Sequence, residues 1–461
     1  MQHQEAMKPL QVFKVSPSSL GSQNLLPSSS TSLPLTFFDI LWLRLPPVQR
    51  VFFYEFPHQP SLFYDAILPK LKHSLSLSLS YYFPLAGTLT WPHHSNKPII
   101  TYNLGDTLSL IIAESDADFN HLSGSDLSEA SKLHHLVPEL IISDDQATVL
   151  ALQVTLFPNY GFSIGVTSHH AVLDGKTSTS FIKSWAYLCN KLGDSSSSSS
   201  PCDLPPELSP FFDREIVKDP KGLEAKYLSD WLKQGGPNNR SLKVWNLQVP
   251  EDSVRGLFKL SRSNIESLKK LVVSKKKETM NLHLSSFVIS LAYAIVCKVK
   301  AEKVNSNRVF VAVNVDCRAR LDPPLPPTYF GNCGGARVAV AETKGMLGED
   351  GIVVSVESLS SALETLKDGV LSGAESWSSF LHDGLNRDDK FMSVAGTPRF
   401  EVYGNDFGWG KPKKVEMVSI DRTGAFCFSD SSNGDGVEIG LVSNKESMDA
   451  FASLFLQGLA F

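Results

Sequence analysis

A strand followed by a short junction and then a helix occurs twice in this chain. Residues 162–167 alternate strictly between apolar and polar side chains, which predicts a half-buried strand, and apolar residues within 181–189 recur at helical spacing. Residues 437–442 and 445–459 repeat that order. Two similar halves predict an α/β protein, and because a histidine occurs at the first junction alone, they predict a single site at the interface of the halves.

Other segments fit the same mixed architecture. Apolar and aromatic runs predict buried strands at 35–43, 51–56 and 309–315. Apolar spacing predicts helices at 61–79 and 285–299. Strands and helices therefore alternate along most of the chain.

The composition changes abruptly near the middle of the chain. The run Ser195–Ser200 and the prolines that follow cannot build a core, so they predict an exposed, mobile connector. At 461 residues the chain is about three times a common domain size. We expect an N-terminal domain over 1–192, a crossover linker over 193–250 and a C-terminal domain over 251–461.

Charge and hydropathy exclude several classes of protein. The sequence has 43 basic and 48 acidic residues, a net charge of -5, which gives no electrostatic basis for binding nucleic acid. The longest apolar run, 287–297, is shorter than the ~18 residues that a membrane span needs. Residues 1–34 lack the apolar segment of a signal peptide, so we expect a cytosolic protein. The six cysteines are scattered, which predicts reduced thiols, no disulfide and no metal site.

His170 lies in the first junction, where a side chain can reach a cleft instead of a packed core. Asp174, four residues later, stands where a helix N-cap would. The ordinary interpretation of such a pair is a hydrogen bond that orders a loop. The preceding His169 and the following Gly175, with a strand and a helix on either side, favour a general base at His170.

Arginines emerge at the end of a second predicted strand. Arg318 and Arg320 follow the strand at 309–315. They can pair with a buried carboxylate such as Asp174, or they can face a ligand. Pairing is favoured, because a carboxylate that points away from a cleft needs a cation partner.

A cluster of lysines lies on a predicted helix in the second half and just beyond it. A capping box that begins at Ser263 starts this helix, which ends near Lys275. Lys275 and Lys276 belong to the cluster. Such a run is usually a solvated face; the alternative is an anchor for a polyphosphate, which needs several cations near a cleft.

Two motifs at a wide separation resemble those of the BAHD family, the plant acyl-CoA-dependent acyltransferases. They are His170–Gly175 and Asp406-Phe407-Gly408-Trp409-Gly410, and the resemblance covers essentially the whole chain. The segment Tyr329–Cys333 is similar to a signature of the branch that acylates anthocyanins and other flavonoid or phenolic glycosides. The resemblance implies two domains, each like chloramphenicol acetyltransferase, with mixed sheets, flanking helices and a tunnel at the interface.

The resemblance also implies roles for individual residues. Asp174 is structural: it turns away from the tunnel and pairs with Arg318. Asp406–Gly410 lies away from the catalytic centre and maintains the shape of the tunnel. Thr397 and Arg399 are expected on the acceptor side.

The expected chemistry starts at the imidazole. A sugar hydroxyl is a poor nucleophile, so a neutral imidazole at His170 must accept its proton as the oxygen attacks a thioester. The tetrahedral oxyanion then needs a donor, for which Trp409 or a backbone N–H near Gly410 is a candidate on spacing alone. No acyl-enzyme and no permanently bound cofactor are required.

The expected reaction is transfer of malonyl from malonyl-CoA to a sugar hydroxyl, the 6-OH of glucose, on a flavonoid, anthocyanin or phenolic glucoside. Lys176 would then bind the malonyl carboxylate or, with equal weight, point to solvent, since a lysine in the first turn of a helix meets an unfavourable dipole. Lys275 and Lys276 would contact the CoA phosphates. Two alternatives stay open: a hydroxycinnamoyl-CoA donor with the same acceptors, and a catalytically silent binding scaffold. The protein is expected to be a monomer.

Overall fold

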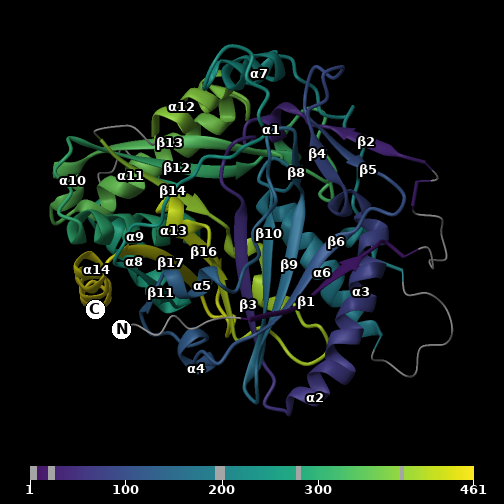
Figure 1. The fold of residues 1–461 in the computed structure, drawn as a ribbon. Helices are drawn as coiled ribbons and strands as arrows, with labels where there is room; N and C mark the ends of the chain where they lie inside the picture. Colours follow the sequence, from purple (N-terminus) through teal and green to yellow (C-terminus); the bar gives the residue numbers. More distant parts are fainter. Residues whose placement is uncertain are drawn as a thin grey trace.

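The described part of the chain folds into three sheets with helices packed against them (Figure 1). The computed structural model describes residues 8–18, 26–27, 29–192, 203–276, 282–384 and 389–460. The helices of the first half are α1 Phe37–Ile40, α2 Pro60–Leu62, α3 Leu68–Tyr81, α4 Phe119–Leu122, α5 Ser131–His134 and α6 Gly175–Lys191. Those that follow are α7 Leu223–Lys233, α8 Arg262–Lys275, α9 Ser286–Ala301, α10 Thr343–Leu347, α11 Gly351–Glu364, α12 Trp377–Gly384, α13 Ile420–Thr423 and α14 Lys445–Gln457.

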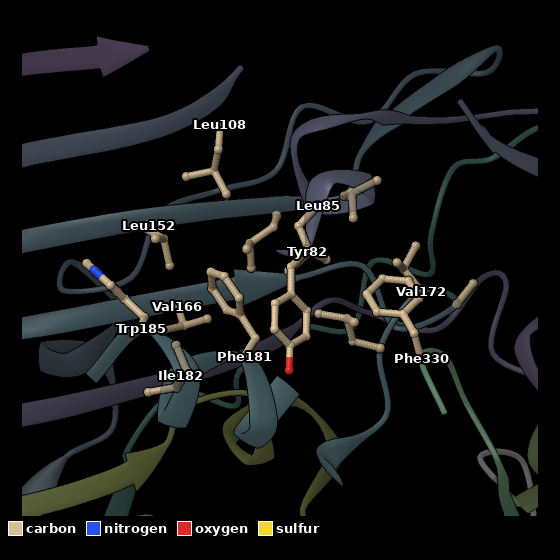
Figure 2. Packing of buried hydrophobic residues seen from close by; sticks show 14 of the residues in the cluster. Tyr82, Leu85, Leu108, Leu152, Val166, Val172, Phe181, Ile182, Trp185 and Phe330 are labelled. Atoms are coloured by element: carbon tan, nitrogen blue, oxygen red, sulfur yellow. The ribbon is translucent and has the colours of Figure 1, made fainter. Parts of the chain in front are cut away.

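The first sheet carries the strand that leads to His170. In spatial order its strands are β1 Lys8–Val15, β6 Leu108–Glu114, β9 Leu150–Phe157, β10 Gly161–Ser168, β3 Val48–Glu55 and β15 Lys414–Met417. Helices α3 and α6 pack on each other and cover one face of this sheet. Figure 2 shows Leu152 and Val166 of the sheet in the same cluster as Phe181 and Ile182 of α6.

Strand β10 is buried on both faces, so the prediction of a half-buried strand is wrong in this respect. The polar side chains turn toward the 119–138 segment, where the Thr167 hydroxyl donates to the Pro138 carbonyl at 2.5 Å. Gly165 allows this segment to approach, because a Cβ there would lie 3.0 Å from the Val137 Cα. The alternation marks two chemically different buried faces.

The second sheet is built mainly from the second half of the chain. In spatial order its strands are β13 Gly334–Glu342, β12 Arg308–Asp316, β14 Lys390–Ala395, β16 Phe426–Asp430, β17 Val437–Asn444, β11 Ser253–Leu260 and β7 Ser128–Glu129. Helices α8, α9, α11 and α14 pack beside it around a separate core (Figure 1). A small third sheet has the order β2 Thr31–Pro34, β5 Ile99–Tyr102, β4 Thr88–Thr90 and β8 Gln146–Thr148. This mixed architecture confirms the predicted α/β class.

The two large sheets exchange strands. Strand β15, from the second half, pairs with β3 in the first sheet, and β7, from the first half, pairs with β11 in the second. Arg255 on β11 fixes this crossing, because its buried guanidinium donates to Glu416 at 2.9 Å and also contacts Asp421. The division into an N-terminal domain that ends at residue 192 and a C-terminal domain that begins at residue 251 stays a prediction. Strand pairing crosses this division in both directions.

The segment 35–43 is not the strand that its apolar composition predicted. It contains α1, and the Asp39 carboxylate starts this helix by accepting hydrogen bonds from the Thr36 N–H at 2.9 Å and the Thr36 hydroxyl at 2.8 Å. A polar cap of this kind stabilises a turn of helix within an apolar run. Similarly, the N-cap of α8 is Ser261, which forms its capping box with Asn264, and not Ser263.

Part of the predicted connector packs onto the core. The run Ser195–Ser200 lies outside the described residues, but α7 further along buries Tyr227 and Trp231. The Trp231 indole N–H donates to the Ile40 carbonyl at 2.7 Å. The expectation of an exposed connector is therefore wrong for α7, whose aromatic side chains outweigh the flanking prolines.

Within the described ranges, no helix is both long enough and apolar enough to cross a membrane. Five of the cysteines, Cys189, Cys297, Cys317, Cys333 and Cys427, are free thiols, and Cys202 is outside those ranges.

We predict that Arg255→Ala lowers the free energy of unfolding by about 3 kcal/mol, because it leaves the buried carboxylates of Glu416 and Asp421 without their shared cation. The measurement is urea unfolding of parent and variant. Lys303→Ala is the control: its ion pair with Glu446 is exposed, and we expect a change below about 0.5 kcal/mol. Equal effects of the two substitutions would contradict the structural role given to Arg255.

Candidate active site

His170 follows the end of β10 in a tight turn that leads into α6. The His169 N–H donates to the Val149 carbonyl at 2.9 Å, and the His169 carbonyl accepts from the Val172 N–H at 3.0 Å. His169 is completely buried, whereas His170 retains some exposure. In the described part of the chain the His170 Nδ1 has no hydrogen-bond partner. The turn therefore brings one imidazole to an accessible position at the end of the sheet.

Burial keeps both imidazoles neutral. It lowers the pKa of His170 to about 4, while the polar backbone of His170 itself and the Asp174 carboxylate act in the opposite direction. Burial and the neighbouring His170 lower the pKa of His169 to about 3. Near pH 7 the His170 imidazole is thus a free base, as proton abstraction requires.

Trp42 determines the plane of the His170 ring. The two rings stack with centroids 4.4 Å apart and planes 6° apart. Trp42 comes from the turn after α1, more than a hundred residues earlier in the sequence. The sequence does not predict this contact, because the apolar composition of segment 35–43 indicates a buried strand and not a helix with a turn after it.

Asp174 performs two structural tasks, one with each carboxylate oxygen. Oδ1 accepts from the Thr177 N–H at 2.8 Å and caps α6. Oδ2 contacts Arg318 Nη1 at 2.8 Å and accepts from the Cys333 N–H at 3.2 Å. The ion pair predicted from the sequence is present. Asp174 thereby joins the helix that follows His170 to the turn directly after strand β12 of the second sheet.

Arg318 is held in place by charge and by carbonyl groups. Burial acts to lower its pKa, but Asp174 and Asp316 together raise the pKa above its ordinary value. Its guanidinium also donates to the Gly331 carbonyl at 3.0 Å. Gly331 has φ = +126°, and a Cβ there would collide with the Arg214 guanidinium, so only glycine fits.

Asn332, in the segment Tyr329–Cys333, holds the main chain of the catalytic turn. Its side-chain amide donates to the His170 carbonyl at 2.9 Å and to Asp39 Oδ1 at 3.1 Å. Asp39 is fully buried and pairs with Arg214 at 3.2 Å. The Tyr329 hydroxyl accepts from Arg214 at 2.7 Å. Residues from three distant segments therefore fix the His170 backbone.

The segment Asp406–Gly410 forms a closed loop away from His170. Asp406 Oδ1 accepts from the backbone N–H groups of Gly408 and Gly410 at 2.8 and 3.0 Å. Phe407 is buried, and its ring lies 5.0 Å from that of Trp185. These contacts stabilise the conformation of the loop itself, so the role of Asp406–Gly410 is structural.

The expectation that Trp409 or a backbone N–H near Gly410 stabilises the oxyanion is wrong. The Trp409 ring lies 5.8 Å from that of Phe162. Phe162 stands at the start of β10 and His170 follows its end, so about 20 Å of extended strand separates the two. Spacing in the sequence carried no information about which end of the strand the loop approaches.

The remaining predicted cations have partners of their own. Lys176 Nζ lies 3.2 Å from Asp316 Oδ2. Lys275, at the end of α8, lies 2.7 Å from Asp350, whose hydrogen bond raises the pKa of Lys275. Helix α8, which ends at Lys275, packs on β11, α9 and α11 of the second half.

Thr397 and Arg399 lie close to the start of α6. Thr397 accepts from the Arg399 N–H at 3.4 Å and starts a short 3-10 helix, Pro398–Phe400. The Phe400 ring packs against Gly175, where a Cβ would lie 2.7 Å from it. The Arg399 side chain is exposed. This segment of the second half therefore approaches the catalytic turn.

Comparison with known proteins identifies the relatives of this chain. The model of the family described as Transferase matches residues 23–456. Malonyl-CoA:anthocyanidin 5-O-glucoside-6''-O-malonyltransferase of Arabidopsis thaliana is 42% identical, over 98% of this chain and 98% of the relative. Phenolic glucoside malonyltransferase 1 of the same plant is 41% identical, over 99% and 98%. Its agmatine coumaroyltransferase is 39% identical, over 98% of each chain.

Solved structures share the fold. The crystal structure of vinorine synthase matches with a TM-score of 0.68 and 21% identity, over 98% of each chain. This similarity confirms the predicted fold.

We predict opposite consequences for substitutions at His170 and Asp174 of the turn motif. His170→Ala is expected to fold normally and to lose acyl transfer, because the imidazole nitrogen it removes has no structural partner. Asp174→Ala is expected to unfold more easily by about 3 kcal/mol, because it leaves Arg318 buried without its closest carboxylate. Thermal unfolding and an ester-forming assay on both variants test this. Equal stability of Asp174→Ala and the parent would contradict its role.

We also predict that acid destabilises the protein through the buried histidines. Between pH 6.5 and about 4 the unfolded chain binds protons at His169 and His170 that the folded chain does not bind, so stability falls as the pH falls. At pH 5.5 each histidine contributes a loss of about 1 kcal/mol relative to pH 7.5. Urea unfolding at both pH values, with His170→Ala as comparison, measures it. An equally steep decline in the variant would contradict the assignment to His170.

Proposed function

We propose, from the premise that the chain belongs to the Transferase (BAHD) family of acyl-CoA-dependent acyltransferases, that it transfers malonyl from malonyl-CoA to a sugar hydroxyl of a flavonoid or phenolic glucoside. The observation that carries the proposal is full-length identity of about 40% to malonyltransferases whose names specify glucosides as acceptors. The name of the anthocyanidin relative also supports the 6-OH of glucose as the acylated position.

The geometry around His170 supports the chemistry of the transfer. The neutral imidazole accepts the proton of the acceptor hydroxyl while the oxygen attacks the thioester carbonyl carbon, forming the new C–O bond. The tetrahedral intermediate then collapses, the C–S bond breaks, and CoA leaves as a thiolate. The protonated His170 returns its proton to the thiolate sulfur, so that the free base is restored. Trp42 and Asn332 hold the ring and the backbone during these steps.

The setting of the reaction follows from the family. We place it in a tunnel between two domains of the chloramphenicol acetyltransferase type, with Thr397 and Arg399 on the acceptor side. The contact of Phe400 with Gly175 supports the latter placement. We further propose that the protein acts as a monomer in the cytosol, which size-exclusion chromatography and a fluorescent fusion would test.

A hydroxycinnamoyl donor is the second candidate. It is supported by the 39% identity to agmatine coumaroyltransferase, which shows that a coumaroyl donor occurs among relatives of similar distance. The acceptor class would be unchanged.

A donor competition distinguishes the two candidates. Purified protein is incubated with one flavonoid glucoside and equal concentrations of malonyl-CoA and p-coumaroyl-CoA, and the product masses are measured. We expect the malonyl ester, and no ester with His170→Ala. A coumaroyl ester would establish the second candidate instead. Absence of both esters over a panel of glucosides would favour a silent scaffold.

A further inference from the structure

In the part of the chain that the structure describes, every buried arginine except one has a strong hydrogen-bond acceptor. Within the described ranges, the buried arginines are Arg44, Arg50, Arg214, Arg255, Arg318 and Arg337. Arg214, Arg255 and Arg318 pair with carboxylates, and Arg44 and Arg337 donate to backbone carbonyls. Among the described residues, Arg50 makes a single hydrogen bond, to the Thr179 hydroxyl at 3.1 Å. Like the other five arginines, Arg50 is buried, but within the described ranges it pairs with no carboxylate and donates to no backbone carbonyl.

Arg50 lies at the same end of the first sheet as His170. It is on β3, directly opposite Val166 of β10, and His170 follows Val166 by four residues. Its partner Thr179 is five residues beyond the Asp174 cap, about 7.5 Å along α6. Only 7% of Arg50 is exposed. The guanidinium is therefore held between β3 and the first turns of the helix that follows the catalytic turn.

The second half of the chain faces Arg50 without neutralising it. Burial lowers the pKa of Arg50, and Cys427 and Asp430 on β16 partly offset this effect. The Asp430 oxygens accept from the backbone N–H groups of Val402 and Tyr403 at 2.7 and 3.3 Å, and the structure has no ion pair between Asp430 and Arg50 among the residues it describes. Burial raises the pKa of the Cys427 thiol to about 11, so the thiol is neutral.

A buried guanidinium without a counter-ion is costly, and such groups in proteins are normally paired. A carboxylate is the ligand that matches its planar array of donors best. We propose that Arg50 binds the free carboxylate of the malonyl group and so selects this donor over uncharged acyl-CoA esters. The inference rests on the proposed function. One methylene group separates the malonyl carboxylate from the reacting carbonyl, so the cation that binds it has to lie near His170.

Arg50 is better suited to this task than Lys176, the cation suggested by the sequence. Lys176 already pairs with Asp316, and its side chain is 35% exposed. An ion pair in contact with water is weak, whereas a charge in a buried position interacts strongly with an ion of opposite sign. A guanidinium also binds a carboxylate through two parallel hydrogen bonds, which an ammonium group cannot do.

The test compares malonyl-CoA, whose acyl group carries a free carboxylate, with acetyl-CoA, whose acyl group is uncharged. Parent, Arg50→Met and Arg50→Lys are assayed with malonyl-CoA and with acetyl-CoA at a fixed concentration of one glucoside. For Arg50→Met we expect kcat/KM for malonyl-CoA to fall about 100-fold and that for acetyl-CoA to change less than about threefold. Arg50→Lys is expected to retain part of the preference for malonyl, because it keeps the charge.

Lys183→Met is the matched control. Lys183 is a cation on α6 itself, but it forms its ion pair at the surface, with Glu401. It is expected to leave the ratio of the two donors unchanged. Melting temperatures identify a variant that does not fold; if Arg50→Met is such a variant, the smaller donor-specific loss in Arg50→Lys is the result to measure. An equal loss of kcat/KM with both donors in Arg50→Met would overturn the proposal. It would also be overturned if the ratio of the two donors changed in Lys176→Met and not in Arg50→Met.

Calorimetric titration with each CoA ester, in the absence of acceptor, separates this inference from the proposed function. Tighter binding of malonyl-CoA than of acetyl-CoA by the parent, lost in Arg50→Met, supports the role of Arg50 even if no glucoside is acylated, and in that case only the proposed reaction fails. Equal affinity of the parent for both esters would overturn the role of Arg50.

Discussion

The buried ion pair between Asp174 and Arg318 is the interaction on which the arrangement of the site depends. It joins the helix after His170 to the turn that follows a strand of the other sheet, and the Cys333 N–H donates a hydrogen bond to the same carboxylate. Desolvation makes such a pair a modest contributor to stability, but removing either partner is costly, so the pair fixes position more than it adds free energy. Its function is to define where helix α6 begins.

A second set of buried polar groups acts on the other side of the histidine. Asp39, held by Arg214, orients the Asn332 amide toward the His170 carbonyl, and Trp42 stacks on the ring. Backbone and side chain are thus fixed by separate contacts. The imidazole can then change its protonation state without the loss of a hydrogen bond that the fold needs.

The local part of this arrangement could be predicted from the sequence, and the long-range part could not. The cap at Asp174 and a pairing with an arginine at a strand end follow from residue type and from the ends of predicted elements, and the family resemblance implies Arg318 as the partner. Trp42, Asn332 and Arg50 come from segments whose proximity to His170 depends on sheet order, which periodicity does not specify. The error at Trp409 has the same origin. Segment 35–43 was mistaken for a strand because one polar cap, Asp39, outweighed an apolar run.

The exchange of strands between the sheets has a consequence for biosynthesis. Strand β3 gains its outer neighbour β15 only from residues 414–417. A chain that emerges from the ribosome with its N-terminus first therefore exposes β3 as an open sheet edge until nearly the whole polypeptide has been made. The N-terminal half, although it contains His170, cannot complete its own sheet, so the nascent chain must keep this edge from aggregating throughout most of its translation.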